Sequence, residues 1–138
     1  MKGLYGNILF MFDEVQNWIE SAEYDLETAE HLFASKRYIY AVFMCHLALE
    51  KILKARLEEI TGQEPPKTHD LKYLLDLTSL SPNEKMKRHI VEIGAKSVVT
   101  RYPVDFKQML RDFSSELVEQ ILQETREVFG WIRKSIRQ

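Results

Sequence analysis

Residues 38–61 read YIYAVFMCHLALEKILKARLEEIT, and this stretch decides the fold class. Its apolar residues recur at intervals of three and four, which places them on one side of an α-helix. The apolar surface is wide, so we expect the helix to be packed on more than one side, as in a bundle interior or a subunit interface. Gly62 and the pair Pro65-Pro66 then end the helix. The expected apolar surface has Val42, Cys45, Leu49, Leu53 and Ile60 at its centre and Phe43 and Leu57 on its flank.

The same periodicity predicts helices on both sides of this stretch. It indicates a helix over residues 13–35, a short helix over 69–77, a longer one that ends near Tyr102-Pro103, and a last one that begins at Phe113 or Ser114. No segment alternates polar and β-branched residues as a half-buried strand does. The predicted fold class is therefore all-α, an up-and-down four-helix bundle with an additional short helix, five helices in all. The apolar stripe of the first helix comprises Val15, Trp18, Ile19, Ala22, Leu26, Ala29 and Phe33.

Polar residues mark two expected helix starts. Thr68 precedes the short helix and is expected to cap it. Ser81 precedes the next helix with Pro82 at its first position, and Glu84 follows three residues after the serine, which is the pattern of a capping box.

Length and composition predict one soluble globular domain. The chain has 138 residues, 45% of them hydrophobic and 29% charged, with a net charge of −2. This charge argues against binding duplex nucleic acid through bulk basic charge, although a local basic groove is left open. We divide the chain into an apolar N-terminal arm, residues 1–12, and one helical bundle domain, residues 13–138. The arm is too apolar for a free tail, so we expect it to dock on the bundle or on a second subunit.

The single cysteine, Cys45, allows no disulfide within the chain and favours a reducing compartment. The longest apolar run, residues 8–12, is far shorter than the ~20 residues that span a bilayer, and we see no signal peptide. We therefore expect a cytoplasmic protein without a membrane partner, in which Cys45 is a small core residue.

Several classes of active site are excluded by missing motifs. The chain has no G-x-S-x-G nucleophile elbow, no G-x-G-x-x-G dinucleotide turn and no P-loop. A helical di-iron site needs Glu-x-x-His, and none of the four histidines has a glutamate three residues before it. We predict neither a metal site nor a cofactor.

Glu50 and Arg101 are the most informative charged residues. Glu50 lies at the edge of the apolar sector of residues 38–61, where an unpaired carboxylate is costly. Arg101 follows Ser97 by four residues and continues an inward-facing stripe to the end of its helix. One interpretation is an ion pair that fixes the register of the bundle, and the other is a polar cleft in which Arg101 binds a phosphate.

Other polar residues have both structural and functional interpretations. His46 lies four residues before Glu50, and we favour a hydrogen-bonded pair over a proton-transfer pair or two metal ligands. His69 and Asp70 stand at an expected helix start, which suits a phosphate site, although Asp70 stabilising its own helix is the simpler account. Asp25 lies at the edge of the first apolar stripe.

Four short segments occur in an order that resembles the HEPN domain (higher eukaryotes and prokaryotes nucleotide-binding). They are AEYDL at 22–26 followed by Ala29-Glu30, LALEKILKA at 47–55, THDL at 68–71, and TRYP at 100–103. The resemblance runs from about Asp13 to the end of the chain.

The resemblance implies a helical bundle that commonly dimerises and is often encoded beside a minimal nucleotidyltransferase, in pairs that can act as toxin–antitoxin systems. The HEPN family also resembles the helical domain that completes the nucleotide site of kanamycin nucleotidyltransferase. One branch of the family consists of metal-independent ribonucleases with an arginine followed, after four to six residues, by a histidine. Arg101 matches that arginine, but Phe106, Lys107 and Gln108 stand where the histidine is required.

We therefore predict a non-catalytic module that forms a homodimer and helps to bind a nucleotide, a minimal nucleotidyltransferase partner, or both. Arg101 would contact phosphate, Glu50 would orient Arg101 or accept from the ligand, His69 would line the cleft, and Asp25 completes the expected site. One alternative is an HEPN ribonuclease that acts on RNA with an atypically placed histidine. Another is a purely structural dimeric scaffold.

Overall fold

The computed structural model describes the backbone of residues 4–137 and the side chains of residues 13–137. This part of the chain contains six α-helices and no strand. They are α1 (Leu4–Ala34), α2 (Tyr38–Thr61), α3 (Leu71–Leu77), α4 (Glu84–Arg101), α5 (Phe106–Asp112) and α6 (Ser115–Lys134). The all-α prediction is confirmed, with six helices in place of five.

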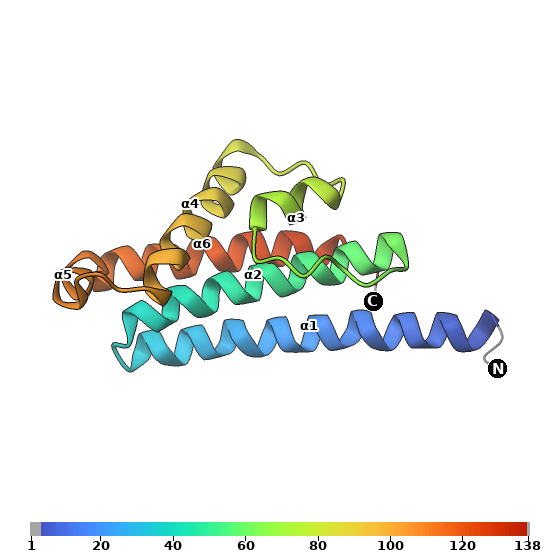
Figure 1. Cartoon of the computed structure of the whole chain (residues 1–138), viewed down its shortest axis with the longest axis horizontal. Helices are drawn as coiled ribbons and strands as arrows, with labels where there is room; N and C mark the ends of the chain where they lie inside the picture. The colour runs from blue at the N-terminus through green and yellow to red at the C-terminus, as the bar shows by residue number, and fades with distance from the viewer. Residues whose placement is uncertain (1–3, 138) are drawn as a thin grey trace.

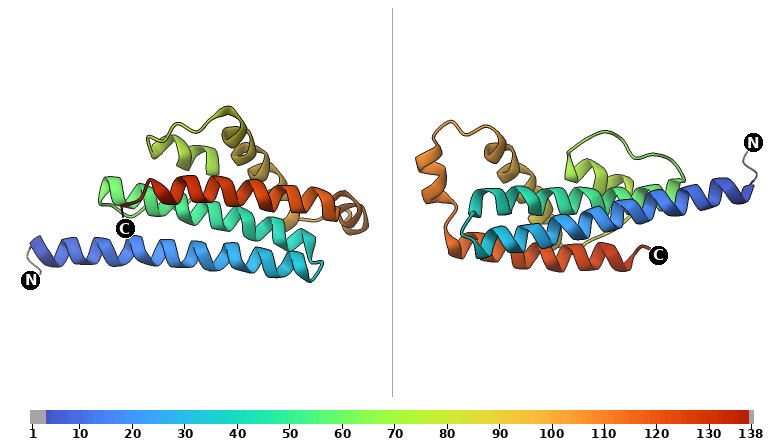
Figure 2. Two further views of the ribbon diagram at one scale, coloured as in Figure 1. Left: turned by 180° about the vertical axis from the view of Figure 1, so that it is seen from behind. Right: turned by 90° about the horizontal axis from the view of Figure 1, so that it is seen from below.

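The long helices α1, α2, α4 and α6 alternate in direction along the chain (Figure 1). Helices α1, α2 and α6 lie close to parallel or antiparallel with one another, whereas α4 is inclined across them (Figures 1 and 2). The short α3 packs against both α2 and α4, and α5 forms the corner between α4 and α6 (Figure 1). No helix in the described residues is both long and apolar enough to traverse a lipid bilayer.

Helix α2 is the centre of the bundle. It contacts all five other helices, and Val42, Cys45, Leu49 and Leu53 are fully buried, whereas Ile60, also expected at the centre of the apolar surface, is 42% exposed. This explains the wide apolar surface of residues 38–61 and confirms both predicted ends of the helix. Gly62 ends α2 in the left-handed conformation, with φ of 68°, which a glycine adopts without steric cost. Burial raises the pKa of the Cys45 thiol to about 12, in keeping with a core residue.

Helix α1 begins at Leu4, nine residues before the predicted start at Asp13. The backbone of most of the predicted arm therefore continues α1, because an isolated glycine such as Gly6 is tolerated within a long helix. This end of α1 extends beyond the ends of α2 and α6 (Figures 1 and 2). Residues 1–3 and the side chains of the whole arm lie outside the described part, so the docking of the arm stays a prediction.

Two predicted caps are wrong by two residues. Asp70, not Thr68, caps α3, and its side chain accepts from the backbone N–H of Tyr73. Asn83 caps α4 in place of Ser81, because its side chain accepts from Met86 N–H at 2.8 Å. Asparagine and aspartate compete well with serine and threonine for such positions, and in both cases they lie closer to the helical residues.

Helix α5 was not predicted. It has seven residues, is capped by Asp105, and buries only Met109. A helix this short, with so small a buried face, has a weak periodic signal. The next start is as expected, because Ser114 caps α6 and its hydroxyl accepts from Leu117 N–H.

Candidate functional site

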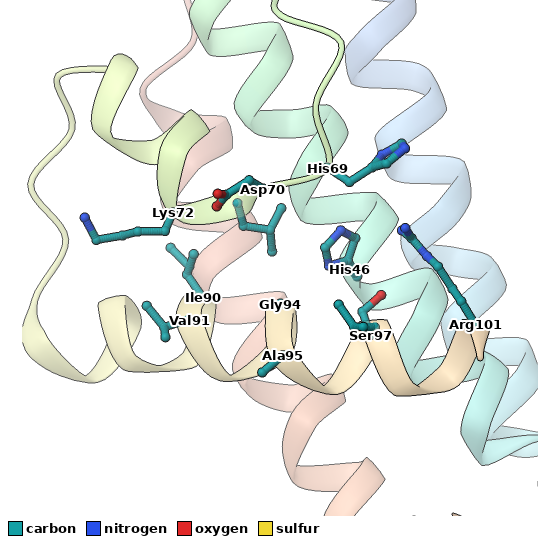
Figure 3. A pocket seen from close by; sticks show the side chains of 12 residues that line it. His46, His69, Asp70, Lys72, Ile90, Val91, Gly94, Ala95, Ser97 and Arg101 are labelled. Carbon is teal, nitrogen blue, oxygen red and sulfur yellow. The ribbon is translucent and has the colours of Figure 1, made fainter. Parts of the chain in front are cut away.

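A cavity of about 470 Å³ lies between α2, α3 and α4, and we call it the main cavity (Figure 3). Its wall along α3 and α4 is largely apolar, and four of its polar side chains carry the argument below. His46 belongs to α2, His69 precedes α3, and Ser97 and Arg101 lie one turn apart at the end of α4. The remaining lining residues are Asp70, Leu71, Lys72, Ile90, Val91, Gly94, Ala95 and Val98.

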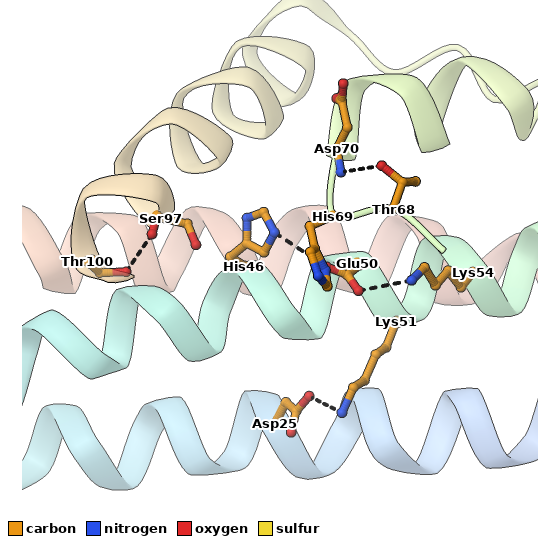
Figure 4. Close-up of polar contacts among 10 residues, drawn as sticks. All are labelled: Asp25, His46, Glu50, Lys51, Lys54, Thr68, His69, Asp70, Ser97 and Thr100. Carbon is orange, nitrogen blue, oxygen red and sulfur yellow. Dashed lines mark hydrogen bonds and ion pairs between the residues drawn. The ribbon is translucent and has the colours of Figure 1, made fainter. Parts of the chain in front are cut away.

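Glu50 lies beneath the two histidines and is buried. Its Oε1 is 2.9 Å from Nδ1 of His69 and 3.5 Å from Nε2 of His46, and its Oε2 accepts from Lys54 Nζ at 3.1 Å (Figure 4). Burial alone would raise the pKa of Glu50, but His46, His69 and Lys54 together lower it to about 2. The carboxylate is therefore ionised near neutral pH, and the Nδ1–H tautomer of His69 is the one that donates to it.

Three side chains on the main cavity carry buried polar atoms without a hydrogen-bond partner among the described residues. They are Nδ1 of His46, Oγ of Ser97 and Nε of Arg101, while Nε2 of His46 has only its 3.5 Å contact with Oε1 of Glu50. His46 is only 3% exposed and Ser97 is fully buried. Buried polar atoms are nearly always hydrogen-bonded to protein or water, so their convergence on one cavity indicates a place for a polar ligand group.

Arg101 does not form the predicted ion pair with Glu50. Its guanidinium carbon instead lies 5.0 Å from the centroid of the Phe43 ring, a cation–π contact. Glu50 is occupied by His69 and Lys54, because the segment after α2 returns across that helix and brings His69 onto the carboxylate. Arg101 therefore has no carboxylate partner in the described part of the chain, and its charge is available at the cavity.

Asp25 lies away from the main cavity. It is buried on α1, and its Oδ2 is 2.8 Å from Nζ of Lys51, which also donates to Ser21. Figure 4 shows this pair between α1 and α2, on the opposite side of α2 from Ser97. The structure thus places Arg101 and His69 on the cavity and Glu50 beneath it, but assigns Asp25 to the α1–α2 contact.

The sequence analysis did not assign Ser97 to the site and favoured a structural role for His46 over a functional one. His46 does approach Glu50, as predicted, yet it also faces the main cavity (Figure 3). The sequence feature that could have identified them is a polar residue on an otherwise apolar helix face, the histidine on α2 and the serine on α4. Asp70 is the cap of α3, which agrees with the simpler account of that residue. Within the described residues, no group of three or more His, Cys, Asp or Glu side chains is placed to hold a metal ion.

Comparisons with known proteins agree with this architecture. The structure is similar to that of TT1696 from Thermus thermophilus, with a TM-score of 0.72 and 18% sequence identity over 88% of this chain and 98% of that one. It is also similar to ST0689, an archaeal HEPN homologue, with a TM-score of 0.71 and 21% identity over 90% of this chain and 98% of that one. No curated protein matches the sequence. The HEPN domain matches residues 15–135, nearly the whole described chain, and the protein therefore belongs to the HEPN domain family.

Proposed function

We propose that this HEPN domain is a non-catalytic module that binds a nucleotide in the main cavity. The observation that carries the proposal is the convergence there of unpartnered polar atoms from His46, Ser97 and Arg101. A phosphate group would accept hydrogen bonds from all three side chains. Arg101 is suited to this role because its planar guanidinium binds phosphate oxygens in pairs.

The rest of the main cavity fits the remainder of a nucleotide. Ile90, Val91, Ala95 and Val98 of α4 form an apolar wall next to the polar end. Sites for small molecules commonly combine such a wall with a few convergent polar groups. Glu50 supports the site from below, because it holds His69 at the cavity mouth while Lys54 balances its charge.

Calorimetric titration with AMP, ADP, ATP and inorganic phosphate tests the proposal. We expect at least one nucleotide to bind the native chain and Arg101→Ala to weaken that binding at least tenfold. Arg88→Ala is the matched control, because Arg88 is an exposed arginine on the same helix and does not line the cavity. An absence of heat for every ligand, or equal losses in both variants, would contradict it.

We further propose that the module acts with a minimal nucleotidyltransferase, in a pair that works as a toxin–antitoxin system, and forms a homodimer. A protein–protein contact is supported by large apolar side chains exposed at the α4–α5 corner, including Val99, Tyr102, Val104 and Leu110, whereas the identity of the partner rests on the family resemblance alone. Light scattering of the purified chain, alone and mixed with a nucleotidyltransferase encoded beside it, tests both partners. A monomer in both samples would count against them.

A second candidate function is a metal-independent ribonuclease. His46 and His69 both approach the ionised carboxylate of Glu50, on the same cavity as Arg101. An imidazole oriented by a carboxylate is suited to act as a general base. Cleavage of RNA in the presence of EDTA, lost in Arg101→Ala and in His46→Ala or His69→Ala, would favour this candidate over the non-catalytic module. If neither nucleotides nor RNA bind, the structural scaffold is the account that is left.

A further inference from the structure

The charges around the main cavity cancel when its histidines are neutral. Two ion pairs are balanced internally, and they are Glu50–Lys54 and Lys72–Asp76. The charges that remain on the cavity are one positive, on Arg101, and one negative, on Asp70. A phosphate monoester carries nearly two negative charges at neutral pH. Arg101 alone does not balance it, so a bound monoester calls for a second cation.

His69 is placed to supply that second positive charge. Its ring lines the main cavity together with Arg101, and Figure 3 shows the two side chains at the same end of the cavity. Nδ1 of His69 lies 2.9 Å from Oε1 of Glu50. Because an ionised carboxylate only accepts, Nδ1 keeps its proton, and Nε2 is the nitrogen that takes up or releases the second one. The side chain is 65% exposed, so this proton exchanges with water without opening the fold.

A bound phosphate and the second proton of His69 stabilise each other. The ionisable side chains that surround the ring come from α2, from α4 and from its own segment, and they are His46, Glu50, Lys54, Asp70 and Arg101. The two carboxylates in this set are matched by the lysine and the arginine. A phosphate adds negative charge next to the ring and so favours the imidazolium. By linkage, the imidazolium strengthens phosphate binding by the same factor.

We infer that the main cavity selects a terminal phosphate monoester, held by the His69 imidazolium and the Arg101 guanidinium, and that this ligand binds together with a proton. The inference rests on the proposed function and adds to it the class of phosphate and its pH dependence. A phosphodiester carries one negative charge and gains less from a second cation. The affinity for a monoester should therefore rise as the pH falls from 8.0 to 6.5, where the phosphate is still mostly dianionic.

The test measures the binding of AMP and of its 5′-methyl ester, a phosphodiester of the same nucleoside, by calorimetry at pH 8.0 and pH 6.5. In the variant His69→Asn, the amide nitrogen replaces Nδ1 as the donor to Glu50 but takes up no proton. His31→Asn is the matched control. His31 is an exposed histidine on α1 that lies 3.6 Å from Glu27 and does not line the main cavity.

We expect AMP to bind the native chain and His31→Asn about fivefold tighter at pH 6.5 than at pH 8.0, which is the strength of a solvent-screened ion pair. The affinity for the methyl ester should change by less than about twofold over the same range. In His69→Asn the rise in AMP affinity should disappear, while AMP still binds at pH 8.0. Titrations in two buffers of different ionisation enthalpy should show that the native complex takes up more protons than the His69→Asn complex.

The outcomes separate this inference from the proposed function. If AMP binds with the same pH dependence in the native chain and in His69→Asn, or if the methyl ester binds as tightly as AMP at pH 6.5, the inference fails and the proposed function stands. If neither ligand binds at either pH, both fail. The comparison of AMP with its ester uses the native chain alone, so it decides the inference even where His69→Asn is unstable.

Discussion

Nδ1 of His69 lies 2.9 Å from Oε1 of Glu50, so a histidine that is largely exposed holds a carboxylate that is almost fully buried. The two residues are 19 positions apart, and the segment between them joins α2 to α3. The contact fixes the return of the chain across α2, and at the same time it fixes one wall of the main cavity. Fold and candidate site therefore depend on the same hydrogen bond.

Replacing Glu50 by glutamine should destabilise the protein by about 2–3 kcal/mol, because the buried ammonium of Lys54 loses its counter-charge. Urea unfolding followed by circular dichroism measures this change. Glu119→Gln is the control, since Glu119 is an exposed glutamate on α6, and it should change the unfolding free energy by less than about 0.5 kcal/mol. Equal stabilities of the two variants would show that the Glu50 network contributes little.

The stability of the native chain should fall in acid through the same carboxylate. The pKa of Glu50 is about 2 when folded, against an ordinary value of 4.5. A lowered folded pKa means that its stabilisation, about 3 kcal/mol, is complete above pH 4.5 and is lost as the pH falls towards 2. Unfolding free energies measured between pH 5.5 and pH 2.5 should therefore decline more steeply for the native chain than for Glu50→Gln. Parallel curves would contradict the prediction.

His89 should make the unfolding free energy depend on pH nearer neutrality. His89 is buried between α4 and α6, where Nε2 lies 2.9 Å from the Thr125 hydroxyl and Nδ1 lies 3.1 Å from a Glu124 oxygen. Burial lowers the pKa of His89 below 6.5, and the nearby carboxylate of Glu124 opposes that shift without cancelling it. Because the folded protein binds a proton at His89 less readily than the unfolded chain, neutral His89 contributes its full stabilisation above pH 6.5. This contribution to the unfolding free energy is lost as the pH falls below that value. In His89→Gln the unfolding free energy should change less with pH just below pH 6.5 than in the native chain. An unchanged slope would contradict the assignment of this pH dependence to His89.

The helices could be predicted from the sequence where a long apolar period fixes them. The bounds of α2 and the cap of α6 follow from that period and from local capping residues. Helix α5 is capped by Asp105, begins at the exposed Phe106 and has one buried side chain, so the sequence carries almost no burial pattern there.

The candidate site could be predicted only in part. Arg101 and His69, which the sequence analysis expected at one cleft, both line the main cavity. The predicted pairing of Glu50 with Arg101 was wrong, because Glu50 pairs with His69. The loop of residues 62–70 that carries His69 has no apolar period from which its contacts could be predicted. Asp25 was misplaced for a related reason. An edge position on a helix shows that a side chain is near a neighbour, but not which neighbour, and Asp25 faces Lys51 of α2.

Gly94 on α4 allows the main cavity to be filled, and Gly130 on α6 is a matched helical control that does not line the cavity. Apart from its chain neighbours and the nearby backbone of its own helix, a Cβ atom on Gly94 or on Gly130 would meet no atom within 4 Å, and only Gly94 lines the main cavity. Alanine at either position should raise the unfolding free energy by up to about 1 kcal/mol, because glycine is a poor helix former. Thermal unfolding of the two variants checks that the backbone accepts a side chain at both sites.

Leucine at the same two positions then separates the cavity from the fold. Gly94→Leu should weaken AMP binding at least tenfold, because its side chain would project into the main cavity, whereas Gly130→Leu on α6 should bind as the native chain does. Calorimetry measures both affinities, and circular dichroism confirms that both variants keep their helix content. If Gly94→Leu folds and still binds AMP with native affinity, the nucleotide lies elsewhere, since a ligand and a leucine side chain cannot share the same space.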